Sequence, residues 1–455
     1  MRLFRRLPLH AAFYTAGCST LCMALPVQAQ SLVDMYEAAR GYDATFLSAR
    51  NLFDANQTKA EQARAGLLPS AAVTGSVQRS QLYLYPDQGG TAANVDRVFG
   101  SKSATVSASQ PLYRPANVAA YKQGVKQVEL ADAQLIAAEQ DLVIRVSQGY
   151  FDVLASQDSL NFVKAQKSAV AEQLAFAKRN FEVGTSTITD TREAQARFDL
   201  VIAQEIAAEN DLRVKRLALD LLVGKDNTQP KPLDGPVALP ALESDSVGAV
   251  ERWVTLSQDQ HPSIKQARIG LDVAELETQK AQAGHKPTVD LVGSYTGTRN
   301  DNGTSVSSVG SRIHIGTVGI NLTVPLFAGY ATQGRIKETL ALEDKARNDL
   351  EGARRAVAQG TRTAYFGVVS GQGQVKALEA AEASSQSALD ANKLGYQVGV
   401  RINIDVLNAQ SQLFQTKRDL AKARYDVLVG GLKLRQANGT LRPEDLNVVN
   451  SLLVK

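Results

Sequence analysis

One stretch of sequence occurs twice in this chain, once in each half, and the two copies agree at residues that end helices. Phe181-Glu182-Val183-Gly184 is repeated as Tyr396-Gln397-Val398-Gly399, and Asp405 repeats Asp190 at the same spacing. Solenoid repeats have much shorter periods, of about 20 to 50 residues. The chain therefore consists of two large tandem halves, and each motif has to be considered as one of a pair.

The segment 1–29 predicts a secretory signal peptide. It contains a basic start with three arginines, an apolar stretch and the small residues Val27-Gln28-Ala29 at the expected cleavage site. Cys18 offers the alternative of a lipid anchor, but Thr15 suits that signal poorly. Cys18 and Cys22 are the only cysteines, so the mature chain has no thiol. Removal of the three arginines lowers the formal net charge from +4 to +1, which gives no indication of a nucleic-acid partner.

Most of the mature chain predicts helix. Six segments are rich in Ala, Gln, Glu, Lys, Arg and Leu and carry apolar residues at helical spacing: 31–64, 115–182, 188–224, 247–282, 329–396 and 402–438. The second of these would extend about 100 Å at about 1.5 Å per residue. Alanine at many positions of the apolar stripes indicates closely packed helices, as in a coiled coil or a helical barrel. The expected organisation is a first repeat at 30–230, a linker at 231–246, a second repeat at 247–446 and a tail at 447–455.

Two windows in each half break this helical pattern and predict strands. They are rich in Thr, Ser, Val and Gly and alternate with a period of two: 70–84, 101–111, 288–298 and 312–326. In the last window Val318, Ile320, Leu322 and Val324 share one face and Thr317, Gly319, Asn321 and Thr323 share the other. A strand of about ten residues with one apolar face suits a transmembrane β-strand in contact with outer-membrane lipid.

The segments between the paired strands are polar and predict loops outside the cell. They cover 86–100 and 299–311, and Pro111 and Pro325 are expected to end the second strand of each half. Four strands cannot close a barrel, and an open sheet edge in lipid leaves backbone groups without hydrogen bonds. Two chains would supply eight strands and three would supply twelve with room for water. A cyclic homo-oligomer is therefore expected.

The order of elements and several motifs resemble the TolC family of outer-membrane channel-tunnel proteins. The residues that carry the resemblance are Tyr396–Gly399, Arg401, Ile404–Gln410, Ala423–Tyr425, Asn438–Leu441 and, in the first half, Phe181–Gly184 with Ile188–Asp190. The resemblance implies a mainly α homotrimer, in which a 12-stranded outer-membrane β-barrel continues into a long periplasmic α-helical barrel. It also implies the exit duct of a tripartite export system for type I protein secretion, multidrug efflux or both. The implied partners are a periplasmic adaptor and an inner-membrane ABC or proton-driven transporter.

The resemblance further assigns roles to residues of the two helix-to-helix turns. Asp405 matches an aspartate ring at the narrow periplasmic entrance, although the usual second acidic position is Asn408 here. Tyr396 and Arg401 match gate residues that would bind Thr189 and Asp190 of the first repeat. The turns themselves, with Val183, Gly184, Val398 and Gly399, would dock the adaptor. A plain alternative remains for Asp190, which also suits the cap of the outgoing helix.

The sequence gives no support for catalysis or for a cofactor. It lacks a Walker-type loop, a nucleophile elbow and the zinc-protease motif, and its three mature histidines, His261, His285 and His314, have no metal-ligand spacing. Two other classes of protein remain open from the residues alone. A soluble periplasmic adaptor would need a compact β-module, and a helical structural protein would leave the amphipathic strands without a role.

Overall fold

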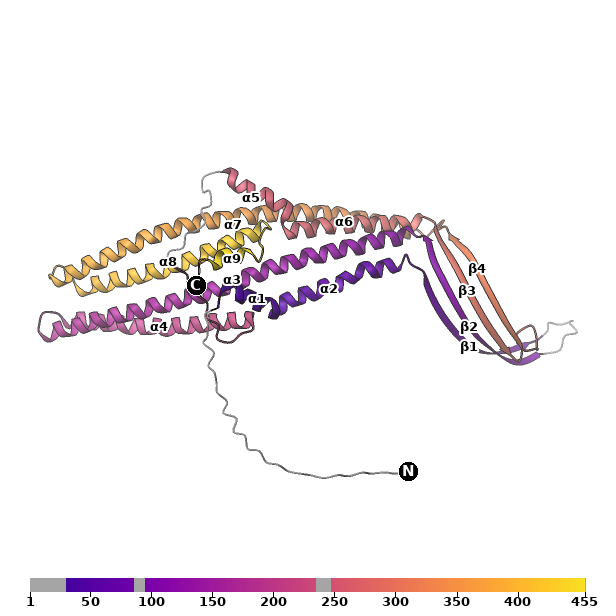
Figure 1. Ribbon diagram of the computed structural model, residues 1–455, viewed down its shortest axis with the longest axis horizontal. Helices are drawn as coiled ribbons and strands as arrows, with labels where there is room; N and C mark the ends of the chain where they lie inside the picture. Colours follow the sequence, from indigo (N-terminus) through magenta and orange to yellow (C-terminus); the bar gives the residue numbers. More distant parts are fainter. Residues whose placement is uncertain (1–29, 86–94, 235–246, 455) are drawn as a thin grey trace, which may run out of the picture.

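The computed structural model describes residues 30–85, 95–234 and 247–454. The expected signal peptide 1–29 and most of the linker 231–246 lie outside the described residues. A four-stranded sheet forms one end of the molecule, and the tips of two helical hairpins form the other (Figure 1). The elements of the first half are α1 (Leu32–Tyr42), α2 (Ala44–Ala65), β1 (Ser70–Leu84), β2 (Val95–Tyr113), α3 (Pro115–Glu182) and α4 (Ile188–Val223).

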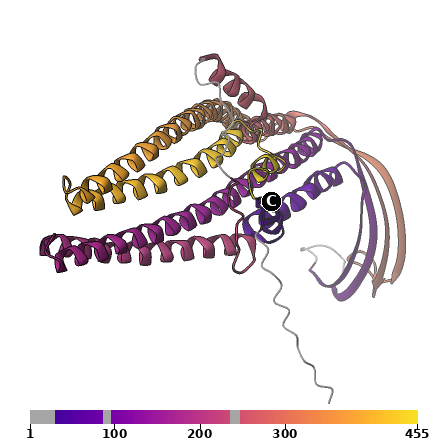
Figure 2. The same ribbon diagram turned by 60° about the vertical axis from the view of Figure 1, so that its left-hand side comes forward.

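The second half repeats this order. Its elements are α5 (Val247–Gln260), α6 (Pro262–Gln282), the short 3-10 helix η1 (Ala283–His285), β3 (Thr288–Asp301), β4 (Ser311–Thr323), α7 (Ala331–Gln397) and α8 (Asn403–Ala437). A short helix, α9 (Asp445–Asn450), follows and extends into the segment expected as a tail. The long helices α3 and α7 run from the sheet to the hairpin tips, with α2 and α6 beside them near the sheet and α4 and α8 beside them near the tips (Figures 1 and 2).

The first helix of each half is broken, which the sequence analysis did not predict. The segment 31–64 divides at Asp43, whose carboxylate accepts a hydrogen bond of 2.8 Å from the Phe46 amide and caps α2. The segment 247–282 divides at His261, whose Nδ1 accepts a bond of 3.1 Å from the Ser263 amide. Pro262 follows His261, and a proline at the first position of a helix favours a new start. The two breaks occupy corresponding places in the two halves, so they belong to the repeat.

Each break lies against the end of the outgoing helix of the same half. Gly224 and Gly439 both adopt left-handed conformations, with φ of +71° and +80°. A Cβ atom at Gly224 would lie 2.4 Å from the Tyr42 ring, and one at Gly439 would lie 2.5 Å from the His261 backbone. Both positions therefore need glycine for its backbone conformation and for its small size.

The strands are longer than predicted at the end far from the helices. β2 begins at Val95 and β3 extends to Asp301, so parts of the expected loops 86–100 and 299–311 are strand. Pro111 does not end β2, because it pairs with Asp290 next to an irregularity that reaches Tyr113. β4 ends at Thr323 and not at residue 326. Proline is tolerated at such an irregularity because the ladder is already interrupted there.

The sheet has the order β1-β2-β3-β4, is antiparallel throughout and has two chemically different faces. The polar face carries hydroxyl pairs, Ser76 with Ser103 at 2.8 Å and Thr105 with Thr296 at 2.9 Å, although Ile313 and Ile315 also lie on it. The apolar face carries large side chains that are all at least 40% exposed: Val73, Val77, Val106, Leu291, Tyr295, Val318, Ile320 and Leu322. Nothing in one chain covers this face.

The core is formed by the helices. Its largest cluster lies midway along the molecule and joins α1, α3, α4, α8 and α9 around Tyr150, Phe151 and Tyr425. Phe151 and Tyr425 stack at 5.6 Å between ring centroids. Side-chain hydrogen bonds join α3 to α8 along the seam between the two repeats: Gln148–Lys433, Asp158–Tyr425, Gln166–Arg418 and Gln173–Asn403. Among the described helices, none is both long and apolar enough to cross a membrane.

Candidate functional site at the hairpin tips

The two turns at the hairpin tips have the same backbone geometry. Gly184 and Gly399 both have φ of +80°. The Thr185 amide donates to the Asn180 carbonyl and the Val400 amide donates to the Gly395 carbonyl, each at 2.9 Å. These contacts close the ends of α3 and α7 in the manner of a Schellman motif.

The turns present apolar side chains to solvent. Val183 is 71% exposed and Val398 is 65% exposed. No Cβ added at Gly184 or Gly399 would meet another atom within 4 Å, so the surface around both glycines is open. This combination offers a partner two equivalent, protruding apolar contacts per chain.

The outgoing helices begin differently, and the difference decides the role of Asp190. Thr187 caps α4 in a capping box, in which the Asp190 carboxylate accepts bonds from the Thr187 amide at 3.0 Å and from the Ser186 hydroxyl at 2.6 Å. Burial opposes ionisation of Asp190, but these hydrogen bonds outweigh it and lower the pKa of the carboxyl. Asp190 is therefore occupied by its own helix cap, as the structural alternative predicted.

Asp405 is not used in this way. Ile402 stands where Thr187 stands in the first repeat, and it has no side chain that could cap α8. The only ion pair of the Asp405 carboxylate is with Arg401, at 3.7 Å between Oδ2 and Nη1. Asp405 thus combines a position in the first turn of a helix with a half-exposed carboxylate. Asn408, one turn further on, accepts a bond of 2.8 Å from Arg197 of α4.

The expected contacts of Tyr396 and Arg401 with Thr189 and Asp190 are not formed within one chain. The Tyr396 hydroxyl is buried without a hydrogen-bond partner among the described residues, and its ring packs edge-on against Phe176 at 5.7 Å. The stem of Arg401 crosses α7 at Gly395, where a Cβ atom would lie 2.7 Å from Arg401 Cγ.

A different residue joins the two tips, and the sequence analysis missed it. Asn403 is fully buried; its Nδ2 donates to the Asp190 carbonyl at 3.2 Å and its Oδ1 accepts from Gln173 Nε2 at 2.6 Å. One side chain of α8 thereby binds both helices of the first repeat. A signal existed, because Asn403 occupies the repeat position of Ile188, and an amide that replaces an apolar residue needs buried partners.

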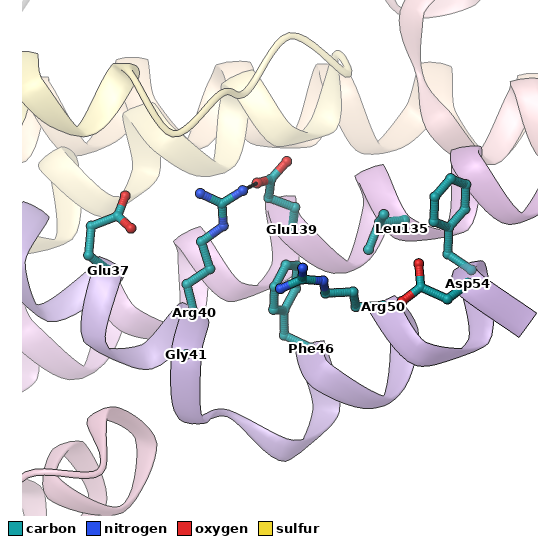
Figure 3. Close-up of a pocket in the computed structure, with 9 residues that line it drawn as sticks. Glu37, Arg40, Gly41, Phe46, Arg50, Asp54, Leu135 and Glu139 are labelled. Atoms are coloured by element: carbon teal, nitrogen blue, oxygen red, sulfur yellow. Dashed lines mark ion pairs between the residues drawn. The ribbon is translucent and has the colours of Figure 1, made fainter.

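A second depression lies midway along the molecule, where α1 and α2 meet α3. It has a volume of about 700 Å³ and is lined by Glu37, Arg40, Gly41, Phe46, Arg50, Phe53, Asp54, Leu135 and Glu139 (Figure 3). Arg40 points toward Glu139 at 3.6 Å, and the Tyr36 hydroxyl donates to the same carboxylate at 3.3 Å. Its acids and bases largely neutralise one another, which fits support of the helix break better than binding of a ligand. Within the described ranges no cluster of three metal-ligating side chains occurs.

The fold and the tips define the class of the molecule, a subunit of an outer-membrane channel with a long helical extension. The family model described as outer membrane efflux protein matches residues 35–225 and 253–440, which are the two repeats. The chain belongs to this outer membrane efflux protein family. It is placed in the outer membrane with its helices in the periplasm, and it acts as a passive channel and not as an enzyme.

Relatives match over nearly the whole chain. Outer membrane protein TolC of Vibrio cholerae is 35% identical over 441 residues, covering 96% of this chain and 97% of the relative. Alkaline protease secretion protein AprF of Pseudomonas aeruginosa is 31% identical over 437 residues, covering 95% of this chain and 89% of the relative. Membership of the family rules out the soluble adaptor and the helical structural protein.

Solved structures show the same fold at low sequence identity. The outer membrane protein VceC of Vibrio cholerae superposes with a TM-score of 0.76 at 18% identity, covering 90% of this chain and 96% of that chain. The CmeC outer membrane channel of Campylobacter jejuni superposes with a TM-score of 0.75 at 15% identity, covering 99% and 98%.

Proposed function

We propose that three copies of this chain form the exit duct of a tripartite export system. The observation that carries the proposal is the sheet: four strands leave the edges of β1 and β4 open and one face apolar. In lipid the open edges need partners, and twelve strands from three chains close a barrel wide enough for water. The polar face of the sheet then lines the lumen, and the helices continue the duct into the periplasm.

The cargo follows from the relatives. One relative is a TolC protein, and two others are named for secretion of proteases, AprF and the proteases secretion protein PrtF of Dickeya chrysanthemi, at 31% and 30% identity. We propose type I protein secretion with multidrug efflux as a second cargo class. Deletion of the gene followed by analysis of secreted proteins and of antibiotic sensitivity tests both. Unchanged secretion and unchanged sensitivity would contradict the proposal.

The partners act at the hairpin tips. An adaptor contacts Val183 and Val398, because these side chains protrude at equivalent turns and have few contacts of their own. An inner-membrane ABC or proton-driven transporter supplies the energy. Val183→Asp combined with Val398→Asp should abolish cross-linking to the adaptor while the trimer still assembles. Glu182→Gln is a suitable control, since it alters the same tip without touching the apolar contact.

The resting duct is shut at the tips, with Asp405 of three chains around the entrance. Tyr396 and Arg401 face the Thr189–Asp190 turn of a neighbouring copy in this arrangement. The unpaired, buried Tyr396 hydroxyl supports a partner from outside the chain, since buried hydroxyl groups in native proteins are normally hydrogen-bonded. The exposed Thr189 supplies a hydroxyl for such a contact.

A further inference from the structure

Four cations interrupt the apolar face of the sheet at the end far from the helices. Lys102, Arg299 and Arg312 lie directly opposite one another on β2, β3 and β4, and Arg79 of β1 lies beside Gly100, two positions from Lys102. Paired residues of neighbouring strands point to the same face, so the four side chains form one cation row on the same side as Val77. The row consists of Arg79, Lys102, Arg299 and Arg312.

A shallow depression adjoins the cation row. The neighbouring row of residues, nearer the helices, is Gly75, Ala104, Gly297 and His314, and three of these have little or no side chain. The depression has a volume of about 390 Å³ and is lined by both rows, including Lys102, Arg299 and Arg312. It can therefore accept a group that reaches the cations from the apolar side.

The row retains a positive charge and unused donors. Its one acidic neighbour, Asp301, binds Lys102 Nζ at 3.0 Å and Arg299 Nε at 2.9 Å. The two terminal nitrogens of Arg299 are left over, because a guanidinium has five donors. Arg79 and Arg312 have no ion pair among the described residues, so four cations face one carboxylate.

The position of the row along the strand places it at a membrane boundary. Leu322 and Arg312 are ten positions apart on β4 and share the apolar face. Ten residues span about 33 Å along a strand. With a tilt of about 40° this is about 25 Å across the membrane, which is the height of the apolar band of an outer-membrane protein. Exposed Phe327 and Tyr330, beyond Leu322, suit the interface on the periplasmic side.

We propose that the cation row binds the phosphate groups of an anionic glycolipid in the outer leaflet of the outer membrane. The face is apolar below the row, which fits acyl chains, and cationic at the level where the headgroups lie. Lysine and arginine bind phosphate oxygens by charge-assisted hydrogen bonds, and arginine does so with two parallel bonds. The site goes beyond the export function, because it concerns the lipid that surrounds the channel.

The test uses the detergent-solubilised full-length trimer and bisphosphorylated lipid A, with bound lipid counted by native mass spectrometry. A triple variant, Lys102→Gln with Arg299→Gln and Arg312→Gln, should bind this lipid about 100-fold more weakly. The matched control removes three exposed cations of α7, Lys337→Gln with Lys345→Gln and Arg355→Gln, and should bind as the wild type does. Lipid A without phosphates should bind the wild type as weakly as the triple variant binds the phosphorylated form.

Further arms keep the result decisive. Heat-modifiable migration shows whether each variant is a trimer; if the triple variant fails to assemble, Arg312→Gln alone should weaken binding about fivefold, because Arg312 has no partner to lose. Arg312→Lys should retain binding. Equal lipid affinity in the wild type and the Gln variants would overturn the proposal, as would equal binding of lipid without phosphates. Competition by inorganic phosphate as effective as that of the lipid would show a site for free anions instead.

Discussion

Replacement of Asn403 should loosen the tip of the second hairpin. Its side chain makes two hydrogen bonds to the first repeat, to the Asp190 carbonyl and from Gln173, and it is fully buried. A buried hydrogen bond contributes about 1 kcal/mol net, and a partner left unsatisfied costs about 1 to 3 kcal/mol. Gln173 and Asp190 are only half-buried, so water can replace part of the loss. We expect Asn403→Ala to cost about 2 to 3 kcal/mol per chain in holding α8 against α3 and α4.

Hydrogen exchange at the first amides of α8 in the solubilised trimer measures this cost. A loss of about 2 kcal/mol raises the open population about 30-fold. Asn408→Ala is the matched control, because Asn408 lies on the same helix and also bonds to α4, through Arg197, but at the surface. It should change exchange by less than about twofold, since exposed contacts contribute little.

A double-mutant cycle isolates the contact from other effects of the substitution. Gln173→Ala combined with Asn403→Ala should show a coupling energy of about 1 kcal/mol or more, since the two side chains bond directly at 2.6 Å. Additive effects of the two substitutions, or exchange in Asn403→Ala no faster than in Asn408→Ala, would refute the reasoning.

Three further predictions concern the entrance, the gate and the middle of the molecule. Polyvalent cations added from the periplasmic side should block single-channel current through three Asp405 carboxylates, and Asp405→Ala should abolish the block; a variant blocked as well as wild type would place the ring elsewhere. Tyr396→Phe combined with Arg401→Ser should raise conductance in planar bilayers without weakening the trimer, and unchanged conductance would remove both residues from the latch. Asp43 has a lowered pKa because of hydrogen bonds from Arg145, against the effect of burial. Its contribution to stability is therefore complete above about pH 4 and is lost as the pH falls through the lowered pKa, so thermal unfolding of Asp43→Asn should depend less on pH below about 4 than that of wild type.

The sequence by itself determined the repeat, the helical and strand segments and the chemistry of the turns. These features are local: a glycine with positive φ ends a helix and alternation of polar and apolar residues marks a strand, whatever surrounds them. The resemblance to the TolC family rested on such local motifs, and the comparisons confirm it.

Tertiary structure decided which residues the repeats exchange with each other. The breaks at Asp43 and His261 depend on partners far away in the sequence, such as Arg145 for Asp43 and Gly439 for His261. Asn403 looks like one more polar residue of a helix start until its position between α3 and α4 is known. The sequence pattern does not show these contacts, because burial and hydrogen bonding between distant segments depend on how the helices pack and not on the residue alone.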